Sequence, residues 1–185
     1  MVGLARQKER RLNINAIALS SSTLRERPTA ADFWKDSPYE SFYAMSSPKA
    51  KGSRGERLAA EIMETLDHDI LRKKNGKLAR LAGNSDHDIV VDGHRVEVKL
   101  SLTWGNEVDQ FTWQQIRSLQ EYDRIIFVGI NPNEAKMWWA TKKDLEDNIF
   151  GKQAFRQHGG KKGKQELYWI RNNIPTWFRT IEEWK

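Results

Sequence analysis

The sequence contains no cysteine, and this absence excludes several kinds of site at once. Disulfides, thiolate zinc sites and cysteine nucleophiles all need that side chain. A chain without cysteine is compatible with a reducing compartment, and we therefore expect a cytoplasmic protein. No stretch approaches the roughly 18 consecutive apolar residues of a transmembrane helix, so no membrane partner is expected. Gly-rich phosphate loops, serine elbows and Rossmann fingerprints are missing as well.

Positive charge is what the sequence has in excess. Its 31 Lys and Arg residues outnumber its 25 Asp and Glu residues, giving a net charge of +6 over 185 residues. That length is typical of a single domain. The excess favours a polyanionic partner such as DNA, whereas a solvated surface of modest positive charge is the alternative. Composition alone leaves both interpretations open.

The first 30 residues differ in composition from the rest. They are rich in arginine and serine, poor in acidic residues, and lack the apolar segment of a secretory signal. A flexible arm that contacts phosphates, simple terminal disorder and an organelle transit peptide all share this composition. Helical pieces broken by Pro38 are expected from Thr29 to Ala44. We divide the chain into a basic arm with a helical extension, 1–50, and a domain with a C-terminal basic loop and helix, 51–185.

Hydrophobic periodicity and turn residues predict the elements that follow. An amphipathic helix is expected at Ser53–Leu66, where Ser53 and Glu56 match a capping box. A second helix is expected at Thr112–Tyr122 and a buried strand at Arg124–Ile130. The other expected elements are a linker, two strands, two helices and a basic loop, in that order: Ser46–Ser53, Lys136–Ala140, Leu167–Arg171, Lys142–Asn148, Thr176–Trp184 and Gly151–Lys164.

A β-hairpin is predicted on either side of Asp92-Gly93. Asp-Gly between two alternating apolar runs is the pattern of a two-residue hairpin turn. With this turn, Asp88 lies opposite Glu97, and directly opposed residues have Cβ atoms roughly 5 Å apart. Because side chains alternate along a strand, Asp88, Glu97 and Lys99 share one face. The opposite face carries the apolar side chains that contact the core: Ile89, Val91, Val96, Val98 and Leu100.

Two opposed carboxylates repel each other, and this predicts a neutralising partner. Mg²⁺ suits the position, because it takes oxygen ligands from one or two carboxylates together with water and phosphate oxygens. Lys99 is then placed to touch both a phosphate and an attacking water. The alternative is a surface salt-bridge cluster in which Lys99 and Arg95 neutralise Asp88 and Glu97. Spacing alone leaves both interpretations open.

The residues Ser85–Ser101, SDHDIVVDGHRVEVKLS, resemble the signature of the PD-(D/E)XK nuclease superfamily. Asp88 opens one strand, and Glu97-Val98-Lys99 lies on the partner; His87 stands where the pattern has proline. The order of elements between Ser53 and Ala140 is also similar. The resemblance implies an α/β (α+β) fold of the restriction-endonuclease-like kind, with an αβββαβ core. Its central mixed sheet would have four to five strands flanked by helices.

The same resemblance implies the site residues. Asp88, Glu97 and the Val98 carbonyl would bind Mg²⁺, with two divalent ions possible, and Lys99 would orient the water. Glu56 matches the helix carboxylate of the family; Glu61 and Glu64 are rival choices, and Glu56 could instead only cap the helix.

A glutamine near the active site is also a frequent feature of the family. Gln114 and Gln115 both match its position, and we choose Gln115 because it begins the Gln-Ile-Arg run. A surface glutamine of no special role is the alternative.

Binding of DNA requires cations outside this acidic hairpin. Two basic stretches, around residues 72–80 and 152–164, are expected to contact phosphates. The residues chosen as DNA contacts are Lys73, Lys74, Trp104, His158, Lys161 and Lys162. Solvated loops are the alternative for each of them.

The leading hypothesis is a Mg²⁺-dependent DNA endonuclease of the type II restriction kind. It would act on double-stranded DNA as a homodimer, at a short specific sequence. The alternatives are a repair, recombination or transposition nuclease of the same fold, which nicks one strand or cuts junctions, and a catalytically inactive DNA-binding module.

Overall fold

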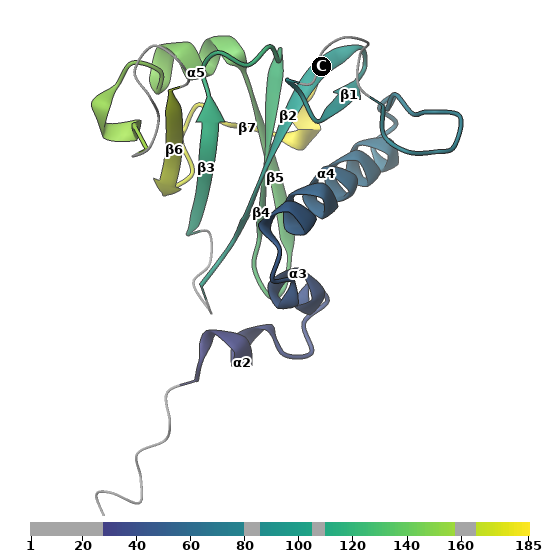
Figure 1. Ribbon diagram of the computed structural model, residues 1–185, viewed down its shortest axis with the longest axis vertical. Helices are drawn as coiled ribbons and strands as arrows, with labels where there is room; N and C mark the ends of the chain where they lie inside the picture. The colour runs from purple at the N-terminus through teal and green to yellow at the C-terminus, as the bar shows by residue number, and fades with distance from the viewer. Residues whose placement is uncertain (1–27, 80–85, 105–109, 158–165) are drawn as a thin grey trace, which may run out of the picture.

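The computed structural model describes residues 28–79, 86–104, 110–157 and 166–185, and places them around a central five-stranded sheet (Figure 1). The strands of this sheet, in spatial order, are β1 (Ile89–Val91), β2 (His94–Leu102), β4 (Arg124–Ile130), β5 (Ala135–Thr141) and β7 (Arg179–Thr180). Strands β2 and β4 are parallel and the other neighbours are antiparallel. The predicted central mixed sheet of four to five strands in an α+β fold is therefore confirmed.

A second sheet and several helices surround the first. The second sheet contains β3 (Phe111–Arg117) and β6 (Leu167–Asn172), which are antiparallel. The helices are α2 (Ala30–Trp34), α3 (Glu40–Ala44), α4 (Pro48–Thr65) and α5 (Lys142–Asn148), with short 3-10 turns at η1 (Gln153–Phe155) and η2 (Ile181–Glu183). No helix in the described ranges is long and apolar enough to cross a membrane.

The hairpin has the register predicted from Asp92-Gly93. Ile89 pairs with Val96 and Val91 with His94. Asp92 and Gly93 have φ values of 49° and 79°, the left-handed pair that a tight hairpin turn requires. The turn chemistry and the apolar alternation therefore specify the same register.

Strand β4 separates two apolar layers, because its side chains alternate. Ile126, Val128 and Ile130 pack in the layer that α4 covers, whereas Ile125 and Phe127 pack in the layer under β3, β6 and α5 (Figure 1). Gly129 also faces the second layer, where a Cβ atom would lie 2.6 Å from the Phe111 ring. The two layers hold α4 and β3 on opposite sides of β2.

Helix α4 begins at Pro48, so the predicted linker at Ser46–Ser53 is wrong. Ser47 is the N-cap and accepts a hydrogen bond from the Ala50 amide, and proline is favourable at the first helical position. The capping box predicted from Ser53 is wrong for the same reason, since Ser53 lies inside the helix. The boundary proposed at residue 50 falls within α4.

The predicted helix at Thr112–Tyr122 is wrong, because residues 111–117 form β3. Phe111 and Trp113 alternate with polar residues, and both are buried against β4. In the described residues, the connection between the parallel strands β2 and β4 therefore contains a strand of the second sheet.

The predicted helix at Thr176–Trp184 is also wrong, because it contains β7 and η2. Phe178 packs in the layer under β3, and Ile181 and Trp184 pack in the layer under α4. The apolar face of a single helix could not pack in both layers.

Most of the remaining element predictions are confirmed, whereas the loop predicted at Gly151–Lys164 contains η1 and lies outside the described residues from position 158 on. Helices α2 and α3 lie on either side of Pro38, as expected. Strands β4, β5 and β6 and helix α5 match their predicted positions to within one residue at each end. The basic arm, up to residue 27, lies outside the described residues.

Candidate active site

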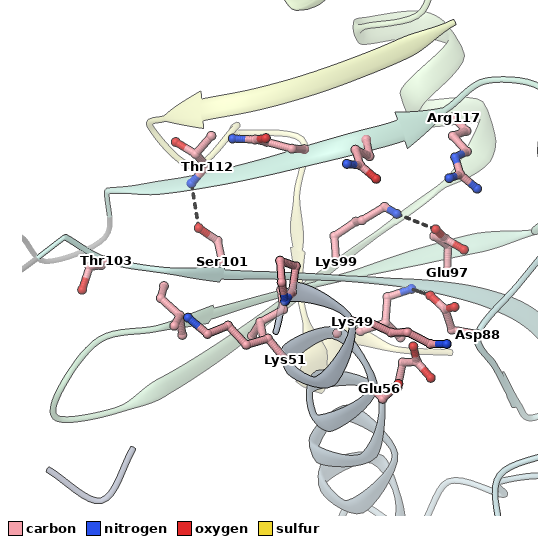
Figure 2. Close-up of a pocket in the computed structure, with 18 of the residues that line it drawn as sticks. Lys49, Lys51, Glu56, Asp88, Glu97, Lys99, Ser101, Thr103, Thr112 and Arg117 are labelled. Atoms are coloured by element: carbon pink, nitrogen blue, oxygen red, sulfur yellow. Dashed lines mark hydrogen bonds and ion pairs between the residues drawn. The ribbon is translucent and has the colours of Figure 1, made fainter. Parts of the chain in front are cut away.

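A cleft of about 910 Å³ runs along β2, between the first turns of α4 and β3. Figure 2 shows side chains from these three elements pointing into it. Its charged lining residues are three carboxylates and four cations: Glu56, Asp88, Glu97, Lys49, Lys51, Lys99 and Arg117. The sequence-predicted residues Asp88, Glu97 and Lys99 therefore share one cavity with cations from both of its walls.

The edge of β2 is open on the side of the cleft, because β1 is short. The pairing of β1 with β2 ends at Ile89 and Val96. Asp88 immediately precedes β1, and its amide donates to the Val96 carbonyl at 3.0 Å. The Val98 amide donates to the Asp88 carboxylate, Oδ2, at 2.9 Å. The short hairpin strand thus sets the Asp88 carboxylate at the edge of β2.

The Val98 carbonyl points to the same edge. In an antiparallel pair, the N–H and C=O of one strand residue face the same neighbour, and the Val98 amide faces Asp88. The edge therefore presents a carbonyl oxygen beside the Asp88 carboxylate. This is the oxygen that the family resemblance implies as a ligand.

Glu97 is buried, and its charge interacts with both acidic and basic neighbours. The residue is only 4% exposed, and its Oε1 lies 2.6 Å from the Lys99 Nζ. Burial raises the pKa of Glu97 to about 7; Lys99 and Arg117 oppose the increase and the Asp88 charge adds to it. A cation bound between the carboxylates would favour the ionised form of Glu97.

The alternative of a surface salt-bridge cluster is wrong in one of its parts. Lys99 does pair with Glu97, but Glu97 is buried and Lys99 partly buried. Arg95 pairs instead with Asp123 and Glu121, and none of these three residues lines the cleft. The ion pairs of Arg95 therefore lie outside the Asp88 and Glu97 site.

Glu56 is the helix carboxylate that reaches the cleft. It follows Lys49 by two helical turns, so both line the same side of α4, and Figure 2 shows Glu56 near Asp88. The rival Glu64 pairs with Arg72 at 2.6 Å, and neither Glu61 nor Glu64 lines the cleft. The structure thus favours Glu56 over both rivals by position.

The donors in the cleft fit a hard divalent cation. Among the described residues, no group of three or more His, Cys, Asp or Glu side chains is arranged to enclose a metal ion. Asp88, Glu97 and the Val98 carbonyl offer two carboxylates and one carbonyl at one edge. Mg²⁺ commonly takes one or two carboxylates and completes its shell with water and phosphate oxygens, so this set is sufficient for it.

Both candidate glutamines line the cleft, from β3. The Gln115 amide donates a hydrogen bond to the Gln157 Oε1 at 2.9 Å.

Arg117 was not predicted from the sequence, and neither were Lys49 and Lys51. Recognition of β3 as a strand would not have indicated Arg117 without its bulge, because regular alternation places residue 117 on the buried face of Phe111 and Trp113. Recognition of the true start of α4 would have indicated the two lysines.

The predicted DNA contacts fall in different places. Trp104 lines the mouth of the cleft and is 81% exposed, an unusual position for tryptophan. Lys73 and Lys74 are exposed in a turn and do not line the cleft. The other three, His158, Lys161 and Lys162, lie outside the described residues.

Comparisons with known proteins include a likeness to solved structures. No model of a known protein family matches the chain, and no curated protein matches it. The solved structure of a bacterial homing endonuclease, I-Ssp6803I, is similar to it with a TM-score of 0.40. The two sequences are 14% identical over 71% of this chain and 80% of that chain.

Proposed function

We propose that the protein is a Mg²⁺-dependent DNA endonuclease. The observation that carries the proposal is the arrangement of Asp88, Glu97 and Lys99 at the open edge of β2, inside a cleft lined by further cations. Opposed carboxylates beside a partly buried ammonium destabilise an inert surface, whereas they are useful for binding a cation and a phosphate together. The positive cleft walls and the net charge of +6 favour nucleic acid as the substrate.

The side chains divide the chemistry of phosphodiester hydrolysis between them. Asp88, Glu97 and the Val98 carbonyl would hold the Mg²⁺, and the bound ion would supply Lewis-acid stabilisation of the charge that develops on the phosphate. Lys99 donates hydrogen bonds to the attacking water and orients it toward phosphorus. The water oxygen forms a bond to phosphorus as one ester P–O bond breaks; one proton of the water ends on the leaving oxygen, and the other is released to solvent or stays on the new phosphate end. The products are one phosphate end and one hydroxyl end.

We infer that the protein acts on duplex DNA as a homodimer, in the manner of a type II restriction enzyme. One cleft holds one Asp88–Glu97–Lys99 set, and two copies would cut the two strands together. Trp104 and the lysines of the cleft walls would contact the DNA beside the cut. Single-strand nicking, junction cutting and binding without cleavage are the competing outcomes.

Digestion of a supercoiled plasmid with Mg²⁺, followed by mapping of the ends, tests this proposal. A dimeric restriction enzyme produces linear DNA with ends at one short sequence. Nicked circles, or cleavage confined to four-way junctions, would support the hypothesis of a repair or recombination nuclease. A protein that binds the plasmid and leaves it intact across Mg²⁺ and Mn²⁺ titrations would contradict the enzymatic proposal.

A further inference from the structure

Arg117 reaches the cleft because β3 is irregular. The pairing of β3 with β6 shifts register between Trp113 and Ile116. In a regular strand, Arg117 would lie on the same face as Phe111 and Trp113, which is buried. The extra residue instead places Ile116 in the core and turns Arg117 to the opposite face. A β-bulge can re-aim a side chain in this way, and bulges are frequent beside active sites.

The bulge is built at a visible conformational cost. Gln115 has a φ of 56°, in the left-handed region that non-glycine residues seldom adopt. Its amide leaves the strand ladder and donates to the Gln157 side chain, which holds the bulge from a neighbouring segment. Unusual backbone that the surroundings hold in place is concentrated at functional sites.

The guanidinium of Arg117 has unused hydrogen-bond donors. Its Nε is shielded from solvent and has no hydrogen-bond partner in the structure. Among the described residues, no carboxylate forms an ion pair with Arg117, although Figure 2 shows its head pointing toward Glu97 and Lys99. A shielded cationic donor without a partner is unfavourable in the free protein. An arriving anion would remove that cost.

We propose that Arg117 binds the phosphate that is to be cleaved, with two parallel hydrogen bonds from the guanidinium to its non-bridging oxygens. The inference rests on the proposed nuclease function and adds to it a substrate-binding residue from β3. A planar guanidinium matches a phosphate in this bidentate way, and a lysine ammonium does not. The phosphate would then lie between Arg117 on one wall and the Asp88–Glu97–Lys99 set on β2.

A purely structural role beside Glu97 is the competing explanation. Glu97 already has a partner, since its Oε1 lies 2.6 Å from the Lys99 Nζ. Arg117 makes no hydrogen bond to Glu97 among the described contacts. The guanidinium is therefore better placed to accept a new anion than to hold this carboxylate.

The test measures DNA binding and DNA cleavage in the same variants. Binding is measured with Ca²⁺ in place of Mg²⁺, as the slope of log Kd against log salt concentration, and cleavage is measured under single-turnover conditions with Mg²⁺. For Arg117→Ala and Arg117→Gln, the slope is expected to fall by about 1, since one phosphate contact is lost. Cleavage is expected to slow by about 100-fold or more, as for the loss of one donor to a developing charge.

Arg117→Lys separates charge from geometry. It retains the cation, so the salt slope is expected to remain near that of the wild type, while cleavage still slows because the bidentate contact is lost. Arg57→Ala is the matched control, because Arg57 is an exposed arginine on α4 outside the cleft lining. It is expected to keep both the slope and the rate. Thermal melting identifies any variant that fails to fold, and Arg117→Lys then carries the test.

The outcomes are distinct. An unchanged slope with lost cleavage in Arg117→Ala would show that Arg117 acts only through Glu97, and this would overturn the phosphate contact. Wild-type slope and rate in both Arg117→Ala and Arg117→Gln would overturn it too. A wild-type protein that binds DNA without cleaving it would instead contradict the nuclease proposal, which is a separate result.

Discussion

Lys99 and Glu97 are two residues apart on β2, and their side chains meet at 2.6 Å within the protein. Burial of such a pair costs more in desolvation than it returns, unless further partners satisfy both groups. The pair is retained beside a second carboxylate, Asp88, and an open strand edge. The cation and phosphate of the proposed function would supply these further partners.

Arg95 and Asp123 are a contrasting pair, with a structural role. The Asp123 carboxylate accepts from the Arg95 amide at 2.8 Å and from its guanidinium at 2.8 Å. These hydrogen bonds join the second hairpin strand to the segment that leads into β4. They lower the pKa of Asp123 from its usual 3.8, with the Arg95 side chain as the largest cause.

The Asp123 interaction predicts a loss of stability in acid. A carboxyl whose pKa is lower in the folded state stabilises the protein above its unfolded pKa, and this contribution disappears as pH falls through the folded pKa. Asp123→Asn is therefore expected to destabilise the protein at about pH 7, and the difference from the wild type is expected to disappear as the pH falls below the lowered folded-state pKa of Asp123. Urea unfolding of both proteins across this range measures the difference. A gap that stays constant with pH would contradict the assignment.

At the scale of elements, the contact between β3 and β4 depends on one glycine. A Cβ atom at Gly129 would lie 2.6 Å from the Phe111 ring, which is 1% exposed and has no room to move away. Gly129→Ala is expected to destabilise the protein by about 1–3 kcal/mol, as an overpacked core does. Chemical denaturation measures the change.

Gly52→Ala is the matched control for that substitution. Gly52 lies within α4, and a Cβ there meets nothing within 4 Å. Alanine is expected to stabilise the helix by roughly 0.5–1 kcal/mol. Equal effects of the two substitutions would show that the Phe111 contact is not a constraint on the sheet.

Local signals in the sequence were sufficient for the hairpin. Asp92-Gly93 specifies the turn, and alternating apolar residues specify the faces, so the positions of Asp88, Glu97 and Lys99 follow from about twelve residues of the chain. The buried strand β4 was equally clear, because an apolar run of its length fits a strand covered on both faces.

Elements that depend on distant contacts were not predicted correctly. Residues 111–117 have apolar side chains at both strand and helix spacing, because the bulge at Gln115 breaks the alternation. The pairing with β6, 50 or more residues further along the chain, is what makes this segment a strand and not a helix. The C-terminal segment is similar, since its aromatic residues are divided between two core layers by the sheet edge that it crosses.

At the scale of the whole molecule, acidic and basic side chains line the same cleft. Carboxylates lie on the hairpin and α4, while cations lie on α4, on β2 as Lys99 and on β3 as Arg117. Such an arrangement attracts a polyanion and still leaves an acidic position for a cation. The wrong helix prediction for β3, together with its unforeseen bulge, left Arg117 outside the expected site.

In the proposed function, the Asp88 carboxylate serves DNA cleavage and not DNA binding. Asp88→Asn retains an oxygen that can accept from the Val98 amide, so the hairpin should fold normally. Asp67→Asn is the matched control, since Asp67 is an exposed aspartate at the end of α4, outside the cleft lining.

Single-turnover cleavage of duplex DNA with Mg²⁺, measured beside the Kd for the same duplex with Ca²⁺, tests this claim most directly. Asp88→Asn is expected to cleave about 100-fold more slowly or worse while it binds DNA as tightly as the wild type, and Asp67→Asn is expected to match the wild type in both. Cleavage by Asp88→Asn at the wild-type rate would contradict the account.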